Sequence, residues 1–186
     1  MKRFLMFLLI VVVALVLFVA TRPASFRVER AISINAPAEA VYAQLEDFHN
    51  WPAWSPWEHL DPAMKRSMSG SASGAGAVYE WTGNDKVGQG RMTITGAKPG
   101  QEIVIQLEFL KPFQATNVAT FSLSPEATGT HVLWAMEGRN NFVAKAMCIF
   151  MPMDKMVGGD FERGLASLKQ VAERGAGAPA DSNAAH

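Results

Sequence analysis

Four side chains of the types that bind metals lie close together between residues 49 and 61. They are His49, Glu58, His59 and Asp61, two imidazoles and two carboxylates. Zinc signatures place their ligands at short fixed intervals, and this spacing matches none of them. Histidines in loops are mostly solvated or act as caps. We therefore expect no metal site here, and no cofactor elsewhere, because the glycines at 74–76 lack the strand-to-helix context of a nucleotide-binding loop.

Sulfur ligands gather in a second segment, KAMCIFMPMDKM, which ends at Met156. Thioether and thiolate sulfurs select Cu(I), so copper binding is one hypothesis. Pro152 interrupts the segment, and methionine at this density also packs adaptably in cores and beside ligands. We favour packing and keep copper binding as an alternative. The sulfur residues are Met147, Cys148, Met151, Met153 and Met156.

A general acid or base must lie inside a site from which water is largely excluded. On the predicted inner face of the sheet only Tyr79 is titratable, and its unperturbed pKa lies far above 7. The pattern therefore argues against an enzyme, provided that no bulge shifts a strand by one residue and exchanges its faces. The charged residues predicted on the opposite, solvated face are Glu80, Arg91, Glu108 and Glu137.

The sheet that positions these side chains is predicted from the alternation of apolar and polar residues. Turn residues separate the strands, as in an antiparallel sheet with one wet face and one covered face. The strands are expected over 25–34, 64–69, 77–81, 89–97, 101–109, 115–124 and 130–137. The residues expected on the covered face are Tyr79, Trp81, Met92, Ile94, Ile105, Leu107, Phe109, Phe121, Leu123, Val132, Trp134 and Met136.

Two helices are expected to flank these strands in the sequence. The first covers 37–47, with Asn35 as its N-cap and Pro37 in its first turn. The second covers 152–174 and would pack its apolar stripe on the sheet. Its glycines each weaken the helix by up to about 1 kcal/mol relative to alanine, and they allow close approach to the sheet or leave room for a ligand. The stripe consists of Val157, Phe161, Leu165, Leu168 and Ala172.

The opening segment 32–57, ISINAPAEAVYAQLEDFHNWPAWSPW, is a strand, a helix and a tryptophan-rich loop. It resembles the START-like (SRPBCC) superfamily, which includes polyketide cyclases/dehydrases and lipid-transfer proteins. The resemblance extends from about Phe26 to Arg174. It implies an α+β helix-grip fold, in which a curved antiparallel sheet of about six or seven strands surrounds a long C-terminal helix, with a cavity between them.

The resemblance implies a binding site for a hydrophobic small molecule or lipid, such as an acyl chain, an isoprenoid or an aromatic polyketide. Two alternatives stay open: an enzyme of the cyclase/dehydratase type, and an interaction domain whose interior is packed and holds no ligand. The expected ligand-binding residues are Tyr79, Trp81, Phe109, Phe121, Trp134 and Phe161. The residues expected at the cavity mouth are Trp51, Trp54, Trp57, Met151 and Met153.

The N-terminal segment 4–20 is an unbroken apolar run preceded by Lys2 and Arg3. At about 1.5 Å per residue a helix of this length reaches about 26 Å, close to the thickness of a hydrocarbon core. Arg22 or Phe18 would occupy the −3 position of a signal-peptide cleavage site, which requires a small residue. We therefore expect an uncleaved single-pass anchor. By resemblance to short bacterial signal-anchors, the soluble domain is expected on the non-cytoplasmic, periplasmic side.

The composition excludes one class of partner. Lys and Arg number 17, Asp and Glu also number 17, and the formal net charge is zero, so nothing attracts a nucleic acid. Cys148 is the one cysteine and excludes an internal disulfide. We expect an anchor over 1–24, a START-like domain over 25–174, and a disordered tail over 175–186 that lacks any apolar pattern.

Overall fold

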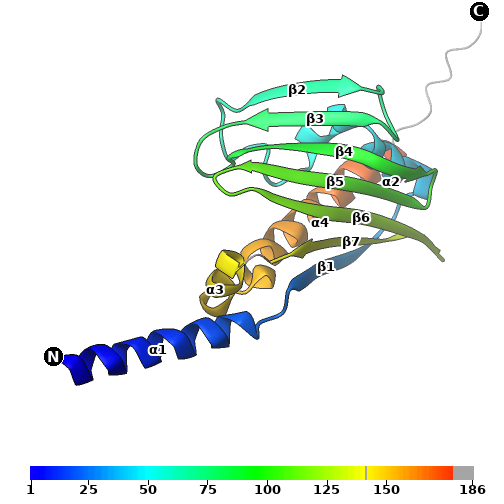
Figure 1. The fold of residues 1–186 in the computed structure, drawn as a ribbon. Coiled ribbons are helices and arrows are strands. Elements are labelled where there is room, and N and C mark those ends of the chain that lie inside the picture. Colours follow the sequence, from blue (N-terminus) through cyan, green and yellow to red (C-terminus); the bar gives the residue numbers. More distant parts are fainter. Residues whose placement is uncertain (141, 178–186) are drawn as a thin grey trace, which may run out of the picture.

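The computed structural model describes residues 1–140 and 142–177, an α+β domain from which one apolar helix projects (Figure 1). Two helices separate the first strand from the other six, which follow one another along the chain, and two more helices come after the last strand. The elements in chain order are α1 (Lys2–Ala20), β1 (Ser25–Ile34), α2 (Ala38–Glu46), the 3₁₀ helix η1 (Phe48–Ala53), β2 (Lys65–Gly70), β3 (Ala77–Thr82), β4 (Gln89–Lys98), β5 (Glu102–Lys111), β6 (Ala115–Glu126), β7 (Gly129–Arg139), α3 (Phe142–Phe150) and α4 (Met153–Gly177).

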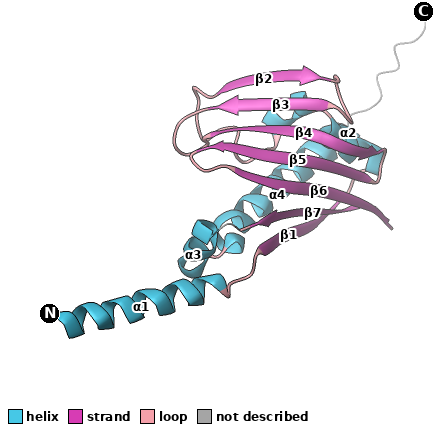
Figure 2. Cartoon of the chain, viewed as in Figure 1, coloured by secondary structure: helices cyan, strands magenta, loops and turns pink. Residues whose placement is uncertain are grey.

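The strands form one 7-stranded antiparallel sheet in the order β1-β7-β6-β5-β4-β3-β2. From β2 to β7 each strand pairs with the next one along the chain, and β1 closes beside β7. The curved sheet wraps around α4, and α2 lies on the same face (Figure 2). The predicted helix-grip fold is therefore confirmed.

The predicted alternation of the strands is also confirmed. Strand β4 has register shifts at 89–90 and 94–96, but they do not exchange its faces over the residues that concern the interior. Arg91 stays on the outer face, where its Nη2 lies 2.8 Å from Glu80 Oε1. Glu137 is likewise outside and pairs with Arg27. Glu80, Arg91 and Glu137 thus lie on the outer face, as the alternation predicts. Two arginines of the strands lie on the inner face instead, since Arg66 pairs in the register with Trp81, and Arg30 pairs with Trp134.

Helix α2 begins later than the sequence predicts. Pro37 is the N-cap residue, and Ala38 is the first helical residue. The predicted N-cap, Asn35, is wrong, because its backbone N–H donates to Glu173 Oε1 of α4 at 2.8 Å and its side chain caps nothing. This bond ties the entrance of α2 to the last turns of α4.

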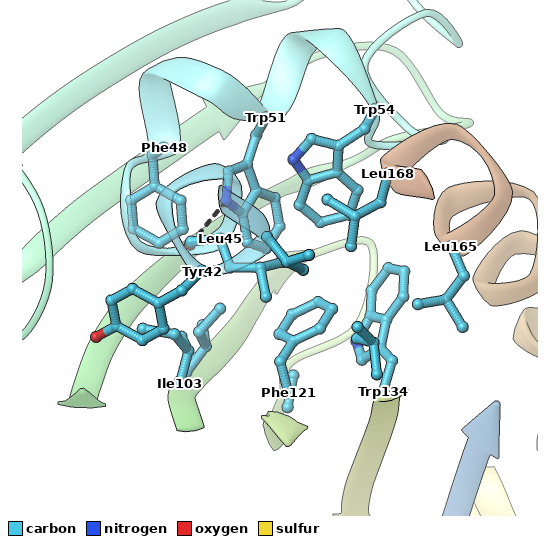
Figure 3. Close-up of a cluster of buried hydrophobic side chains, with 14 of the residues drawn as sticks. Tyr42, Leu45, Phe48, Trp51, Trp54, Ile103, Phe121, Trp134, Leu165 and Leu168 are labelled. Atoms are coloured by element: carbon cyan, nitrogen blue, oxygen red, sulfur yellow. Dashed lines mark hydrogen bonds between the residues drawn. The ribbon is translucent and has the colours of Figure 1, made fainter. Parts of the chain in front are cut away.

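The tryptophan-rich loop, which contains Trp51, Trp54 and Trp57, folds back on α2. The indole Nε1 of Trp51 donates to the Leu45 carbonyl at 3.2 Å, and that of Trp54 donates to the Gln44 carbonyl at 3.1 Å. Each indole therefore buries its ring while keeping its N–H paired. Figure 3 shows both rings pointing from the loop toward Phe121 of the sheet, where they form part of the core.

Helix α4 covers the sheet with the predicted stripe, of which Phe161, Leu165, Leu168 and Ala172 are buried. Gly164 explains how closely the helix approaches. A Cβ at this position would lie 2.8 Å from the Trp134 ring, so only glycine allows the helix to rest on the indole without displacement. The helix extends to Gly177, beyond the predicted end at 174, and the rest of the predicted tail, 178–186, lies outside the described residues.

Helix α3 lies in the sulfur-rich segment, for which the sequence analysis predicts no helix. It packs against the end of α1, and Lys145 Nζ donates to the Ala20 carbonyl at 3.4 Å. Helix α1 itself exposes nearly all of its apolar side chains, and only Val19 is buried. By length and composition α1 is able to span a membrane, a property that an N-terminal signal sequence shares.

Candidate ligand-binding cavity

A cavity of about 380 Å³ lies between the inner face of the sheet, the tryptophan-rich loop and the first turns of α4. Its walls are mainly aromatic and aliphatic, and its volume falls within the range of small-molecule sites. The lining residues are Trp51, Ser55, Trp57, Glu58, Met64, Tyr79, Trp81, Lys86, Val87, Met92, Ile105, Leu107, Phe109, Ala119, Trp134, Met136, Met156, Val157 and Phe161.

Most of the aromatic residues predicted to bind the ligand lie in the wall. Tyr79, Trp81, Phe109, Trp134 and Phe161 all line the cavity. Trp81 and Phe109 meet edge to face at 6.0 Å between ring centroids, and Trp134 stacks on Phe161 at 4.1 Å. These contacts hold the rings in fixed orientations. The loss of side-chain conformational entropy when a ligand binds is therefore small.

Phe121 is the predicted ligand-binding residue that does not line the cavity. It is fully buried behind Trp134, with 4.7 Å between the stacked ring centroids. Trp54 also packs behind the wall, edge to face with both Phe121 and Trp134. Alternation along a strand identifies the inner face but cannot tell which inner residues border a cavity and which are covered by a loop.

The cavity opens between the β3–β4 turn and the start of α4. The exposed lining residues there are Lys86 and Met156. Of the residues predicted at the mouth, Trp51 and Trp57 line the cavity wall, whereas Met151 and Met153 do not line it. The tryptophan-rich loop therefore contributes Trp51 and Trp57 to the cavity wall.

A buried carboxylate, missed in the sequence, forms the polar part of the wall. Glu58 is 5% exposed and lines the cavity together with Tyr79. The Tyr79 hydroxyl donates to Glu58 Oε1 at 2.5 Å, and Arg66 Nε donates to Glu58 Oε2 at 2.6 Å. Arg66 Nη2 also donates to the Glu58 backbone carbonyl at 2.8 Å. The expectation that Tyr79 is the interior's lone titratable group is therefore wrong.

The pairing of these groups explains why a charge is tolerated in an apolar wall. Arg66 lies behind Glu58, partly in solvent, and supplies the compensating positive charge. Burial, and then the hydrogen bond to Glu58, raise the pKa of Tyr79 far above its usual value. The phenol is thus a permanent hydrogen-bond donor to the carboxylate at physiological pH.

The ring of Trp134 belongs to the same wall, and the residue is 3% exposed. Among the described residues its Nε1 is buried and has no hydrogen-bond partner, and an unpaired buried N–H costs free energy.

The side chains considered as metal ligands do not come together. Among the described residues no group of three or more His, Cys, Asp and Glu side chains is placed to hold a metal ion. His49 pairs with Asp47 at 2.7 Å, and Asp61 accepts from the backbone N–H groups of Ala63 and Asn84. Of the sulfur residues in the copper hypothesis, Met147 has its side chain outside the described residues, and Met156 lines the cavity.

A wider hollow of about 550 Å³ on the outer face of β1, β6 and β7 is open to solvent. Arg27 and Glu137, which line it, are paired with each other, and Arg139 also lines it. The hollow is not enclosed, and the inner cavity is the stronger candidate.

Solved structures similar to this chain share its fold. A Staphylococcus aureus protein of unknown function matches 84% of this chain and 98% of its own, with TM-score 0.61 and 14% identity. The Aha1 dimer from Colwellia psychrerythraea matches 82% and 99%, with TM-score 0.55 and 20% identity. The di-domain ARO/CYC StfQ of the steffimycin biosynthetic pathway matches 82% of this chain and 51% of its own, with TM-score 0.59 and 13% identity.

No curated protein matches the chain. A family model does, and it spans residues 25–173, which include every strand of the sheet and nearly all of α4. The chain therefore belongs to the family described as polyketide cyclase / dehydrase and lipid transport.

Proposed function

We propose that the protein is a membrane-anchored binding domain for a hydrophobic small molecule or lipid, which it holds in the cavity between the sheet and α4. The observation that carries the proposal is the cavity of about 380 Å³ with its aromatic walls and a small buried polar part that includes Glu58. An interaction domain without a ligand would have a filled interior instead. Burying about 200 Å² of apolar ligand surface contributes roughly 5 kcal/mol before the entropic cost of association.

The position of the opening supports the membrane as the source of the ligand. The β3–β4 turn, the start of α4 and α3 lie at the end of the domain from which α1 leaves (Figure 1). Exposed apolar side chains, among them Phe113 and Phe142, lie in the β5–β6 turn and in α3 at this same end. A tether raises the effective concentration of a membrane-derived ligand near the mouth.

The side of the membrane belongs to the same proposal. With α1 as an uncleaved anchor and its N-terminus in the cytoplasm, the binding domain lies outside. Protease added to intact spheroplasts is then expected to digest the domain, and protection of the domain would place it in the cytoplasm.

The proposal is tested by asking what the full chain carries out of the membrane. Native mass spectrometry of protein in membrane-derived nanodiscs, followed by organic extraction, is expected to find a hydrophobic compound enriched over empty nanodiscs. Ala119→Phe places a ring in the cavity and should abolish the enrichment. Val118→Phe, on the exposed face of the same strand, is the matched control and should retain it. Equal lipid content in all three proteins would refute the proposal.

A second function is favoured by one observation. Glu58 and Tyr79 place a carboxylate and a phenol together in the cavity. A cyclase/dehydratase would need such titratable groups in its interior, and the strand pattern in the sequence predicts only Tyr79 there. Glu58 would then act as a base on the bound ligand. An enzyme would lose turnover in Glu58→Gln and convert its extracted ligand in single-turnover assays, whereas a carrier would release the ligand unchanged.

A further inference from the structure

The polar residues of the cavity wall are Ser55, Glu58 and Tyr79, with the exposed Lys86 at the opening. At Glu58 and Tyr79 the wall offers hydrogen-bond acceptors more than donors. Tyr79 uses its one hydrogen on Glu58 Oε1, which leaves the lone pairs of its own oxygen free. The protein supplies one bond to each carboxylate oxygen of Glu58, and a carboxylate accepts about four. The donors of Arg66 are directed at Glu58 and at the Met64 carbonyl, and Arg66 does not line the cavity.

This distribution of groups discriminates between the possible polar ends of a ligand. A ligand carboxylate would meet the Glu58 carboxylate in an apolar site, where like charges repel strongly. A ligand ammonium would bring a second positive charge to a carboxylate that Arg66 already neutralises. A hydroxyl is uncharged and donates to Glu58, whose carboxylate still has acceptor capacity.

We propose that the cavity selects an uncharged apolar molecule that carries a hydroxyl group, and that this hydroxyl donates a hydrogen bond to the Glu58 carboxylate beside Tyr79. The inference rests on the proposed function, because it presumes that the cavity binds a ligand. It goes further by naming the functional group that is recognised and the residue that recognises it.

Three probes with the same naphthalene ring separate the contributions of the ring, the donor and the charge. They are 2-naphthol, which donates, 2-methoxynaphthalene, which only accepts, and 2-naphthoate, which is anionic. Calorimetric titration of the full chain in nanodiscs at neutral pH, corrected with empty nanodiscs, gives the affinities. Because a hydrogen bond to a charged group contributes about 1.5–3 kcal/mol, 2-naphthol is expected to bind at least about tenfold more tightly than 2-methoxynaphthalene. The naphthoate is expected to bind more weakly than both.

Glu58→Gln tests the role of the carboxylate with little change in volume. The variant should bind 2-naphthol more weakly than the wild type and 2-naphthoate more tightly, since the repelling charge is gone and Arg66 remains. A gain in naphthoate binding cannot result from a loss of folding. Glu80→Gln is the matched control, because Glu80 follows Tyr79 on the outer face of β3, and it should leave all three affinities unchanged.

The outcomes distinguish this inference from the proposed function. Equal binding of the three probes, or tightest binding of the naphthoate, would overturn hydroxyl selection while leaving the cavity as a binding site. Absence of binding by all three probes would count against the binding function itself and against the inference with it. Unchanged naphthoate affinity in Glu58→Gln would show that Glu58 does not recognise the polar group of the ligand.

Discussion

Arg30 of β1 and Asp154 in the first turn of α4 form a two-point ion pair, with Nη1 2.8 Å from Oδ1 and Nη2 3.1 Å from Oδ2. Arg30 Nε also donates to Glu162 Oε1 at 2.7 Å, and Glu162 directly follows the wall residue Phe161 in α4. The pair therefore fixes the start of α4 to the edge of the sheet. Met156 and Val157, in this part of α4, border the opening of the cavity.

Breaking this pair is expected to loosen the start of α4. The hydrogen bond to Arg30 holds the pKa of Asp154 below its usual value. A depressed folded-state pKa stabilises the fold above the ordinary aspartate pKa of about 3.9, and this stabilisation is lost as the pH falls through the lower folded-state value. Amide protection factors in 153–161 should therefore stay constant from pH 6 down to about pH 4 and drop below it.

Hydrogen exchange read by mass spectrometry checks this expectation. Asp154→Asn should lower protection of the segment several-fold at pH 6 and remove most of its pH dependence. Arg27→Gln is the control, since Arg27 lies on the same strand but pairs with Glu29 and Glu137. If Arg27→Gln had the same effect on α4, the specific role of the Arg30–Asp154 pair would be excluded.

Gly164 and Gly159 should respond to alanine in opposite directions. At Gly164 a Cβ would lie 2.8 Å from the Trp134 ring and 3.1 Å from Pro56, so Gly164→Ala is expected to destabilise the fold by about 1–3 kcal/mol. At Gly159 the nearest atom is the end of the flexible Arg163 side chain at 3.6 Å, so Gly159→Ala should stabilise by up to about 1 kcal/mol. Urea unfolding measures both, and stabilisation by Gly164→Ala would contradict the packing described for α4.

The pKa of Tyr79 predicts how stability depends on alkaline pH. Because burial and the bond to Glu58 raise the pKa, the stabilisation is complete below the ordinary tyrosine pKa of about 10 and is lost as the pH rises through the folded-state value. The free energy of unfolding should therefore fall more steeply above pH 10 in the wild type than in Tyr79→Phe. Equal slopes in the two proteins would show that Tyr79 is not held protonated by the fold.

Glu58 and Arg66 should behave as a coupled pair. Arg66→Met leaves the buried carboxylate without its counter-charge and is expected to cost about 2 kcal/mol. In the double variant Arg66→Met, Glu58→Gln the charge is absent, so the loss should be smaller than the sum of the single effects by about 1 kcal/mol or more. Strict additivity in urea unfolding would mean that the ion pair contributes nothing to the site.

The sequence predicts the sheet well because apolar residues of period two determine both the strands and their inner face. The placement of Tyr79 inside and of Glu80 outside follows from that alternation alone. Glu58 could not be found in this way, since loop residues have no period, and only the turn after Trp57 directs the carboxylate inward. Arg66 of β2 shares the inner face with Met68 and is a useful signal, but nothing in the sequence pairs it with Glu58.

Phe121 and the mouth residues show a second limit. The inner face of β6 is periodic, yet whether Phe121 borders the cavity depends on how Trp51 and Trp54 fold over it. These contacts join residues far apart in the chain. The alternation of apolar and polar residues therefore predicts which residues are buried. It does not predict which of these buried residues line the cavity.

The most direct test of the central claim is photo-crosslinking of the full chain in membranes with a diazirine-bearing alkyl alcohol, followed by peptide mapping. The account predicts labels on β3, β5 and the first turns of α4, where Trp81, Phe109 and Val157 line the cavity. These labels should disappear in Ala119→Phe and persist in Val118→Phe. Labelling confined to α1 and α3, or unchanged by Ala119→Phe, would contradict a ligand-holding cavity.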